Sequence, residues 1–168
     1  MKNILFICLF FFSIACSSIN KSPKLIDCPL VFFASEHRNY ISSDNEEITL
    51  ENLAYKANIN NYNFNNSCFQ QNNIITFPLE VLFVVYPLDK SNENISLPVY
   101  VALLDSFDNL IEIQYFSVTG KFLTDIDTKQ YIETDLPESI KIITSSTKPV
   151  STLILGFMLN NKKERLIN

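Results

Sequence analysis

The sequence predicts an all-β domain, and three observations carry this prediction. From Pro29 onward, apolar residues recur in short segments, several of which alternate with a period of two, as in half-buried strands. Clusters rich in Asn, Asp and Ser separate the segments and are typical of turns. None of the segments shows the helical spacing of apolar residues. A chain of 168 residues has room for one domain of this kind. We therefore expect one two-layer antiparallel β-sandwich of about seven to eight strands, like the immunoglobulin and fibronectin-III folds.

The strands are expected at intervals along residues 28–160, which we assign to the sandwich. The expected ranges are 30–33, part of 48–64, 74–86, 97–104, 110–118 and 150–159, with shorter candidates at 131–133 and 140–143. In the third range the side chains of Phe77, Leu79, Val81, Phe83 and Val85 share one face. Pro78 in that range predicts an edge or a bulge, because proline cannot donate to a strand ladder. Residues 105–109 predict a hairpin loop, and 161–168 a polar C-terminal tail.

Residues 1–15 predict a signal peptide. Lys2 supplies one positive charge, the run 4–12 is almost wholly apolar, and Ala15 is a small residue of the kind that precedes cleavage. The apolar stretch is about 12 residues long, too short for a bilayer core that needs ~20. The chain is therefore expected to be exported.

The sequence Ser13-Ile14-Ala15-Cys16 resembles the lipobox of bacterial lipoproteins. The resemblance implies diacylglycerol on the Cys16 sulfur, cleavage before Cys16 and acylation of the new amino terminus with fatty acid such as palmitate. Ser13 departs from the usual Leu. Ser17, in place of Asp, resembles the pattern that is sorted to the outer membrane, with the domain facing the periplasm. An ordinary secretory signal with a free Cys16 is the alternative.

Residues 16–27 predict a lipidated N-terminus followed by a flexible tether, because they are mostly polar, contain Pro23 and lack any periodicity. From Ser17 to Asp27 the chain extends at most ~40 Å. The folded domain is therefore expected close to the membrane surface.

The four cysteines can each be given a role. Cys8 lies in the signal peptide, and Cys16 is the lipidated residue that the lipobox implies. Cys28 and Cys68 remain in an exported chain, where two remaining thiols usually form a disulfide. The bond would close a loop of about 41 residues. The alternative is a metal or redox site with two free thiols, but the chain has no CxxC motif and His37 is its single histidine.

Several short motifs of the expected sandwich resemble a family of small uncharacterised lipoproteins of Gram-negative bacteria. They are Cys28-Pro29 before a strand, Ala57 in a strand leading to Cys68, Leu97-Pro98-Val99-Tyr100-Val101-Ala102, and Leu155-Gly156-Phe157-Met158-Leu159-Asn160. The resemblance implies the same fold and the same disulfide. It implies no catalytic residues, because that family has no established activity.

The sequence offers little chemistry for an enzyme. Its two glycines, Gly120 and Gly156, exclude Gly-rich phosphate loops and dinucleotide fingerprints. A net charge of −5 gives no reason to expect a nucleic-acid partner. His37 is expected to be a solvated loop residue, since it lies between Glu36 and Arg38 and no nucleophile motif accompanies it. We therefore expect no enzyme and no cofactor, with a hydrolase centred on His37 as the lowest-ranked hypothesis.

A metal site is not expected either. Asp125, Asp127, Glu133 and Asp135 suggest calcium, but Lys129, Gln130 and Leu136 occupy positions where an EF-hand loop needs a ligand or glycine. The alternative is a calcium site on the surface formed by some of these carboxylates without the EF-hand pattern. One histidine and two paired cysteines cannot form a structural zinc site.

The clearest sign of function is a pair of aromatic dipeptides, Phe32-Phe33 and Tyr115-Phe116. Neighbouring residues of a strand face opposite sides, so one member of each pair is expected to point away from the core. An outward aromatic patch indicates an interaction surface. The leading hypothesis is therefore a membrane-anchored, non-enzymatic binding or scaffold module with a partner protein in the bacterial envelope. The alternative is a lipid- or small-ligand-binding module with an apolar cavity inside the sandwich.

Overall fold

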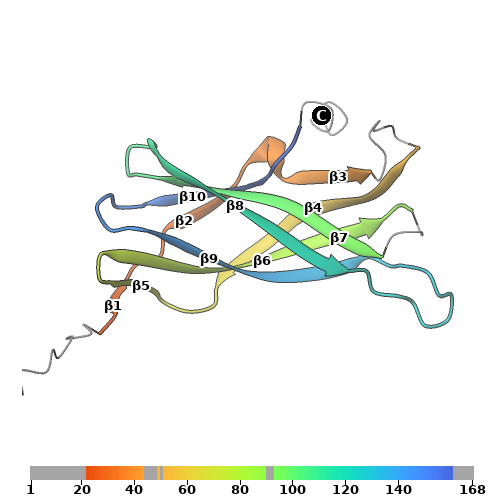
Figure 1. Cartoon of the computed structure of the whole chain (residues 1–168), viewed down its shortest axis with the longest axis horizontal. Coiled ribbons are helices and arrows are strands. Elements are labelled where there is room, and N and C mark those ends of the chain that lie inside the picture. Colours follow the sequence, from red (N-terminus) through yellow and green to blue (C-terminus); the bar gives the residue numbers. More distant parts are fainter. Residues whose placement is uncertain (1–21, 44–48, 50, 90–92, 161–168) are drawn as a thin grey trace, which may run out of the picture.

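The computed structural model describes residues 22–43, 49, 51–89 and 93–160. This part of the chain forms ten strands and one 3-10 turn in two packed sheets, which confirms the predicted all-β sandwich (Figure 1). The expected signal peptide, Cys16 and the polar tail lie outside the described residues. The elements are β1 Lys24–Ile26, β2 Leu30–Phe33, η1 Ser35–His37, β3 Asn39–Ser43, β4 Leu53–Phe64, β5 Cys68–Gln71, β6 Ile74–Pro87, β7 Asn94–Leu104, β8 Leu110–Lys121, β9 Thr134–Ser145 and β10 Thr152–Phe157.

The larger sheet, sheet A, is built around β6, which pairs along both edges. β9 pairs with β6 from Ile74 to Val85, while β4 and β5 share the opposite edge and β3 and β1 pair with them in turn. On the shared edge, the ladder with β5 ends at Thr76 and the ladder with β4 begins at Leu79. Pro78 therefore falls in a gap between two partners, where a residue without an N–H is tolerated.

The smaller sheet, sheet B, has the strand order β2-β10-β7-β8. Its strands pair antiparallel except β2 and β10, which are parallel, so the expectation of an antiparallel sandwich holds for every strand pair but this one. Arg38 stands at the corner where the chain passes from β2 to β3. Its Nε donates to the carbonyl of Ile59 at 2.9 Å, and its guanidinium lies 5.0 Å from the centre of the Phe33 ring.

The core lies between the sheets and is made by alternate residues of the strands. In β6 the alternation places the predicted face inward, where all five side chains are buried; they are Phe77, Leu79, Val81, Phe83 and Val85. From sheet B, Phe157 reaches the rings of Phe83 at 5.8 Å and Tyr40 at 5.3 Å. Tyr55 adds a polar link between the sheets, because its hydroxyl donates to the carbonyl of Ser96 at 2.7 Å.

Several predicted boundaries were wrong. The structure has more strands than the seven or eight expected, because the short strands β1, β3 and β5 were not foreseen. The range 131–133 is not a strand: Tyr131 forms only an isolated bridge with Thr124. The candidate at 140–143 is the middle of a much longer strand, β9. The predicted tether also ends too late, because Lys24–Ile26 pairs with β5 as β1.

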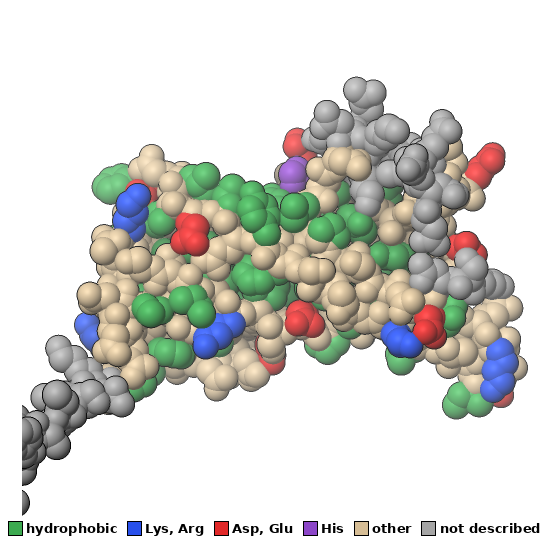
Figure 2. Space-filling view, in the orientation of Figure 1, with side chains coloured by type: hydrophobic (Ala, Val, Ile, Leu, Met, Phe, Trp, Pro, Cys, Tyr) green, Lys and Arg blue, Asp and Glu red, His purple; other side chains and the backbone are tan. Residues whose placement is uncertain are grey.

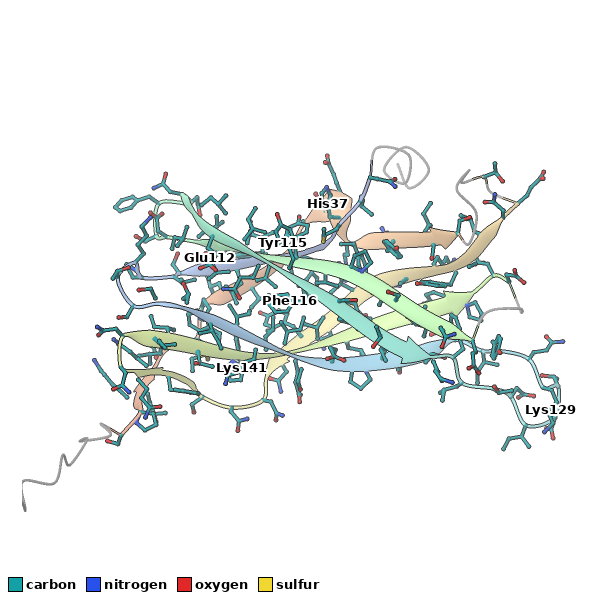
Figure 3. All side chains as sticks on the ribbon, in the orientation of Figure 1. His37, Glu112, Tyr115, Phe116, Lys129 and Lys141 are labelled. Atoms are coloured by element: carbon teal, nitrogen blue, oxygen red, sulfur yellow. A yellow bond between two sulfur atoms is a disulfide. The ribbon has the colours of Figure 1, made fainter. Side chains whose placement is uncertain are left out.

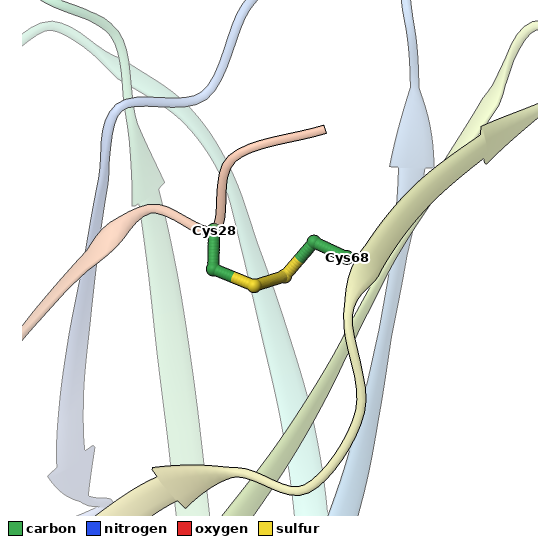
Figure 4. The surroundings of a disulfide bond; sticks show 2 residues. All are labelled: Cys28 and Cys68. Atoms are coloured by element: carbon green, nitrogen blue, oxygen red, sulfur yellow. A yellow bond between two sulfur atoms is a disulfide. The ribbon is translucent and has the colours of Figure 1, made fainter. Parts of the chain in front are cut away.

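The predicted disulfide between Cys28 and Cys68 is present (Figure 4). Cys28 lies in the short segment that joins β1 in sheet A to β2 in sheet B, and Cys68 opens β5. The two Cα atoms are 5.3 Å apart, and Cys68 is fully buried. The bond therefore holds the beginning of the domain against the β5–β6 hairpin.

We expect replacement of both cysteines (Cys28→Ser with Cys68→Ser) to lower the free energy of unfolding by about 4 kcal/mol, because the bond restricts a loop of about 41 residues in the unfolded chain. Urea denaturation of the domain measures this loss. Wild-type protein reduced with dithiothreitol serves as the control and should match the double variant. Equal urea midpoints for oxidised wild type and the double variant would contradict the prediction.

Candidate functional site

The outward side of sheet B is the most unusual surface of the described domain. The strand register aligns Phe32, Ile154, Ala102 and Ile113 in one row across all four strands. Adjacent rows add further uncharged residues, and we call the whole set the apolar face; its other members are Leu30, Pro98, Tyr100, Leu104, Leu110, Tyr115, Ser117, Thr152, Gly156 and Met158. No acidic or basic residue stands among these positions.

The apolar face is open to solvent. Tyr115 is 63% exposed and Phe32 56%, whereas their neighbours Phe116 and Phe33 pack against the core. This confirms that one member of each aromatic pair points outward. Figure 2 shows hydrophobic side chains gathered along the upper part of the view, where Figure 1 places β8 and β10. Tyr115 and Phe116 lie on opposite sides of β8 (Figure 3).

A glycine and a tyrosine shape the middle of the apolar face. Tyr100 lies across Gly156 on the neighbouring strand: a Cβ on Gly156 would come within 2.7 Å of the Tyr100 hydroxyl and 2.8 Å of the ring. The Tyr100 ring also meets the imidazole of His37 edge-on, with centroids 5.6 Å apart. Burial raises the pKa of the Tyr100 hydroxyl above its ordinary value. The contact between His37 and Tyr100 packs η1 against sheet B.

Along one side of the apolar face, β8 is joined to β9 of the other sheet by side chains. Gln114 Nε2 donates to the carbonyl of Ile143 at 2.8 Å, and the buried Thr144 hydroxyl donates to Glu112 Oε2 at 3.1 Å. Glu112 is labelled on β8 in Figure 3. Polar side chains that point inward at a sheet edge discourage a further strand from pairing there. This edge of sheet B is therefore unfavourable for the addition of a further strand.

The outer side of sheet A has a different character. It carries shallow depressions of about 560, 330 and 240 Å³. The largest lies between the β4–β5 loop and β9, with Pro78 in its floor and Lys141 at its margin (Figure 3). Asn65 Nδ2 donates to Glu80 Oε1 at 2.6 Å beside it. Both sheet faces are thus accessible. On sheet B the apolar face is a continuous uncharged area that ends before the exposed ion pair of Lys121 with Glu93 at the far end of β8.

The expectation that His37 is a solvated loop residue was wrong. Its side chain is half-buried against Tyr100, and its Nδ1 is shielded from water with no hydrogen-bond partner in the part of the chain that the structure describes. A general base needs a hydrogen-bonded nucleophile or a carboxylate to orient it. The Nδ1 atom has neither, so the site gives no support to a hydrolase centred on His37.

The suggested calcium ligands do not converge. Among the described residues, no group of three or more His, Cys, Asp or Glu side chains is placed to hold a metal ion. Asp125 Oδ1 instead accepts hydrogen bonds from the Thr128 backbone N–H at 2.7 Å, the Thr128 hydroxyl at 2.8 Å and the Asp127 N–H at 3.1 Å. These hydrogen bonds hold the pKa of Asp125 below its ordinary value, and the bond from the Thr128 backbone contributes most. The carboxylate shapes the loop that contains Lys129 (Figure 3).

Comparison of the chain with protein-family models, with curated proteins and with solved structures gives no match. The resemblance to small Gram-negative lipoproteins therefore stays a prediction from the sequence. Within the described ranges, no helix has the length and apolarity needed to cross a membrane.

We expect Gly156→Ala to destabilise the domain by about 1–3 kcal/mol, because the added methyl group displaces the Tyr100 ring. The same substitution in a Tyr100→Ala background should be neutral or slightly stabilising, since glycine weakens a strand interior. Thermal or urea unfolding of the four proteins of this double-mutant cycle measures the coupling. A loss of the same size in both backgrounds would contradict the proposed contact.

Proposed function

We propose that the protein is a lipid-anchored lipoprotein of the bacterial envelope whose sandwich is a non-enzymatic binding or assembly module. The observation that carries the proposal is the uncharged, solvent-exposed apolar face of sheet B. Antiparallel sheets with one face in water normally alternate apolar inward and polar outward residues. Sheet B instead has apolar residues at most outward positions, and contiguous apolar patches on soluble domains mark interaction sites.

The chemistry of the apolar face favours a protein partner. Tyr115 and Tyr100 combine a large apolar ring with a hydroxyl, and tyrosine is enriched among the residues that dominate protein interfaces. The lack of charge on the face favours a partner surface that is also apolar, because an unpaired charge buried against it would be costly. A second protein of the envelope meets this requirement.

The alternative, a ligand cavity between the sheets, has weaker support. The rings of Phe83, Phe157 and Tyr40 occupy the middle of the sandwich with centroids 5.3 and 5.8 Å apart. The depressions described above open instead on the outer surface of sheet A. A small ligand in the region of these three rings would have to displace core side chains.

The proposed anchor rests on the lipobox-like sequence that ends in Cys16, and the Cys28–Cys68 disulfide supports export, since such bonds persist in oxidising compartments. We expect the wild-type protein to incorporate labelled palmitate in cells and to fractionate with outer membranes. Cys16→Ala should do neither, whereas Cys8→Ala is the matched control and should behave as wild type. Equal labelling of Cys16→Ala and wild type would rule out the anchor.

Photocrosslinking in intact cells tests the binding module. A photoreactive phenylalanine at position 115 is expected to capture a discrete partner protein, whereas the same group at position 141, on the outer face of sheet A, should not. Tyr115→Asp should weaken the interaction by about 2 kcal/mol or more, because it places a charge in an apolar interface. Capture of only lipid or other copies of the chain at position 115 would count against a heterologous protein partner.

A further inference from the structure

The described chain begins at one particular end of the sandwich. β1 pairs with β5 so that Lys24 lies opposite Gln70, immediately before the β5–β6 turn at Asn72 and Asn73. Residues before Ser22 therefore join the domain at this end, at the lower left of Figure 1. If Cys16 is lipidated, as proposed above, this is where the domain is tied to the bilayer.

We call this part of the molecule the turn end, because three connections meet there. They are the β5–β6 turn, the β7–β8 loop at 105–109 and the β9–β10 connection at 146–151. Backbone hydrogen bonds hold them together: Ser146 N–H donates to the Asn73 carbonyl at 2.9 Å, and Ser151 N–H donates to the Leu104 carbonyl at 2.9 Å. The turn end thus spans both sheets as one surface.

Large apolar side chains project from the turn end; they are Leu25, Leu30, Ile74, Phe107 and Leu110, all exposed. Phe107 is the most exposed of them at 83%. It is presented by a firmly built loop, because Asp105 Oδ1 accepts hydrogen bonds from the backbone N–H groups of Phe107 at 2.8 Å and Asn109 at 2.9 Å. The Asp105 carboxylate is therefore bound to the backbone of its own loop, and the Phe107 ring projects from the loop into solvent.

The opposite end of the sandwich is also apolar, so exposure alone does not select a membrane-facing surface. The loop between β8 and β9 exposes Leu123, Ile126 and Ile132, with Ile126 82% exposed. The two ends differ in their distance from the tether. β8 and β9 are each 12 residues long, which separates the ends by about 40 Å. From Cys16 to Lys24 the chain reaches at most ~28 Å.

The short tether therefore excludes contact between the Ile126 loop and the bilayer that holds Cys16 while the sandwich stands upright. We infer that the turn end rests on the lipid surface, with Phe107 and Leu110 inserted among the acyl chains next to the headgroups. This inference deepens the proposed function and depends on the lipid anchor. It leaves the rest of the apolar face of sheet B, beyond Leu30 and Leu110, pointing sideways and accessible to a partner.

The charges at the turn end are compatible with a lipid surface of low net charge. Lys24, Lys148 and Asp108 are exposed there. The Asp105 carboxylate accepts hydrogen bonds from its own loop. These bonds keep its pKa below the ordinary value, and the bond from the Asn109 side chain contributes most. Contact of the turn end with the lipid surface therefore depends mainly on insertion of apolar side chains rather than on charge.

The chain has no tryptophan, so a single introduced tryptophan reports its own surroundings. The full lipidated protein is reconstituted in phosphatidylethanolamine–phosphatidylglycerol vesicles with and without bromine-labelled phosphatidylcholine. Three variants are compared: Phe107→Trp at the turn end, Ile126→Trp at the opposite end as a control of equal exposure, and Tyr115→Trp on the apolar face. We expect a blue shift and strong loss of emission for Phe107→Trp only, with the other two unchanged.

The other outcomes overturn the inference in distinguishable ways. Quenching of Tyr115→Trp as strong as that of Phe107→Trp would mean that the domain lies flat on sheet B. Absence of quenching in all three variants, with the protein still floating with vesicles, would mean that the domain is held away from the bilayer although the anchor is present. Loss of flotation of the wild-type protein would remove the anchor and the inference together.

Discussion

The pairing of β6 along both of its edges is the interaction on which the rest of the domain depends. One 14-residue strand receives β9 on one side and both β4 and β5 on the other. Its inward face supplies Phe77 and Phe83, around which the core forms. The gap between β4 and β5 is also what allows Pro78 in a central strand. β5 pairs with β6 on one side of this gap, and Cys68 opens β5. The pairing therefore brings Cys68 to Cys28, and the disulfide binds the start of the domain to the β5–β6 hairpin.

The two outer faces follow from the same register but differ in chemistry. On sheet A, Lys141 and Pro78 face each other across β9 and β6, and amide and charged groups line the surface. On sheet B, Ile154 and Ala102 stand at corresponding outward positions between Phe32 and Ile113. A polar outer face is satisfied by water, whereas an apolar one gains free energy when it is covered. Of the two outer faces, the one on sheet B would therefore gain more free energy from being covered.

The long strands could be predicted because their patterns are local. The range 30–33 coincides with β2, and the predicted inward face of 74–86 is the observed one, since alternation alone decides which side chains are buried together. The short strands could not be predicted. β3 and β5 are brief and partly polar, and they are strands because β4 and β6 offer them a ladder. Residues 134–139 were also not predicted as a strand. They show little alternation of apolar and polar residues, and they are extended because they pair with β6.

The candidate site divides in the same way. The dipeptides Phe32-Phe33 and Tyr115-Phe116 sufficed to predict outward aromatics, because alternation in a strand is fixed by backbone geometry. Their assembly into one face with Ile154 depends on strand order, which no local pattern encodes. The contact of Tyr100 with Gly156 of β10 and His37 of η1 likewise joins residues 56 and 63 positions apart in the chain, which only the folded register brings together.

The sequence by itself determined that the domain is all-β, which side chains of the long strands form the core, and that Cys28 and Cys68 are the pair left to form a bond. These features depend on residue type and spacing along a few neighbouring positions. Only the tertiary structure decided that β1 belongs to sheet A, that His37 is packed rather than solvated, and that the apolar outward residues form one continuous face. Those features depend on which distant strands pair, and that choice is made by the free energy of the whole packed sandwich rather than by any one segment.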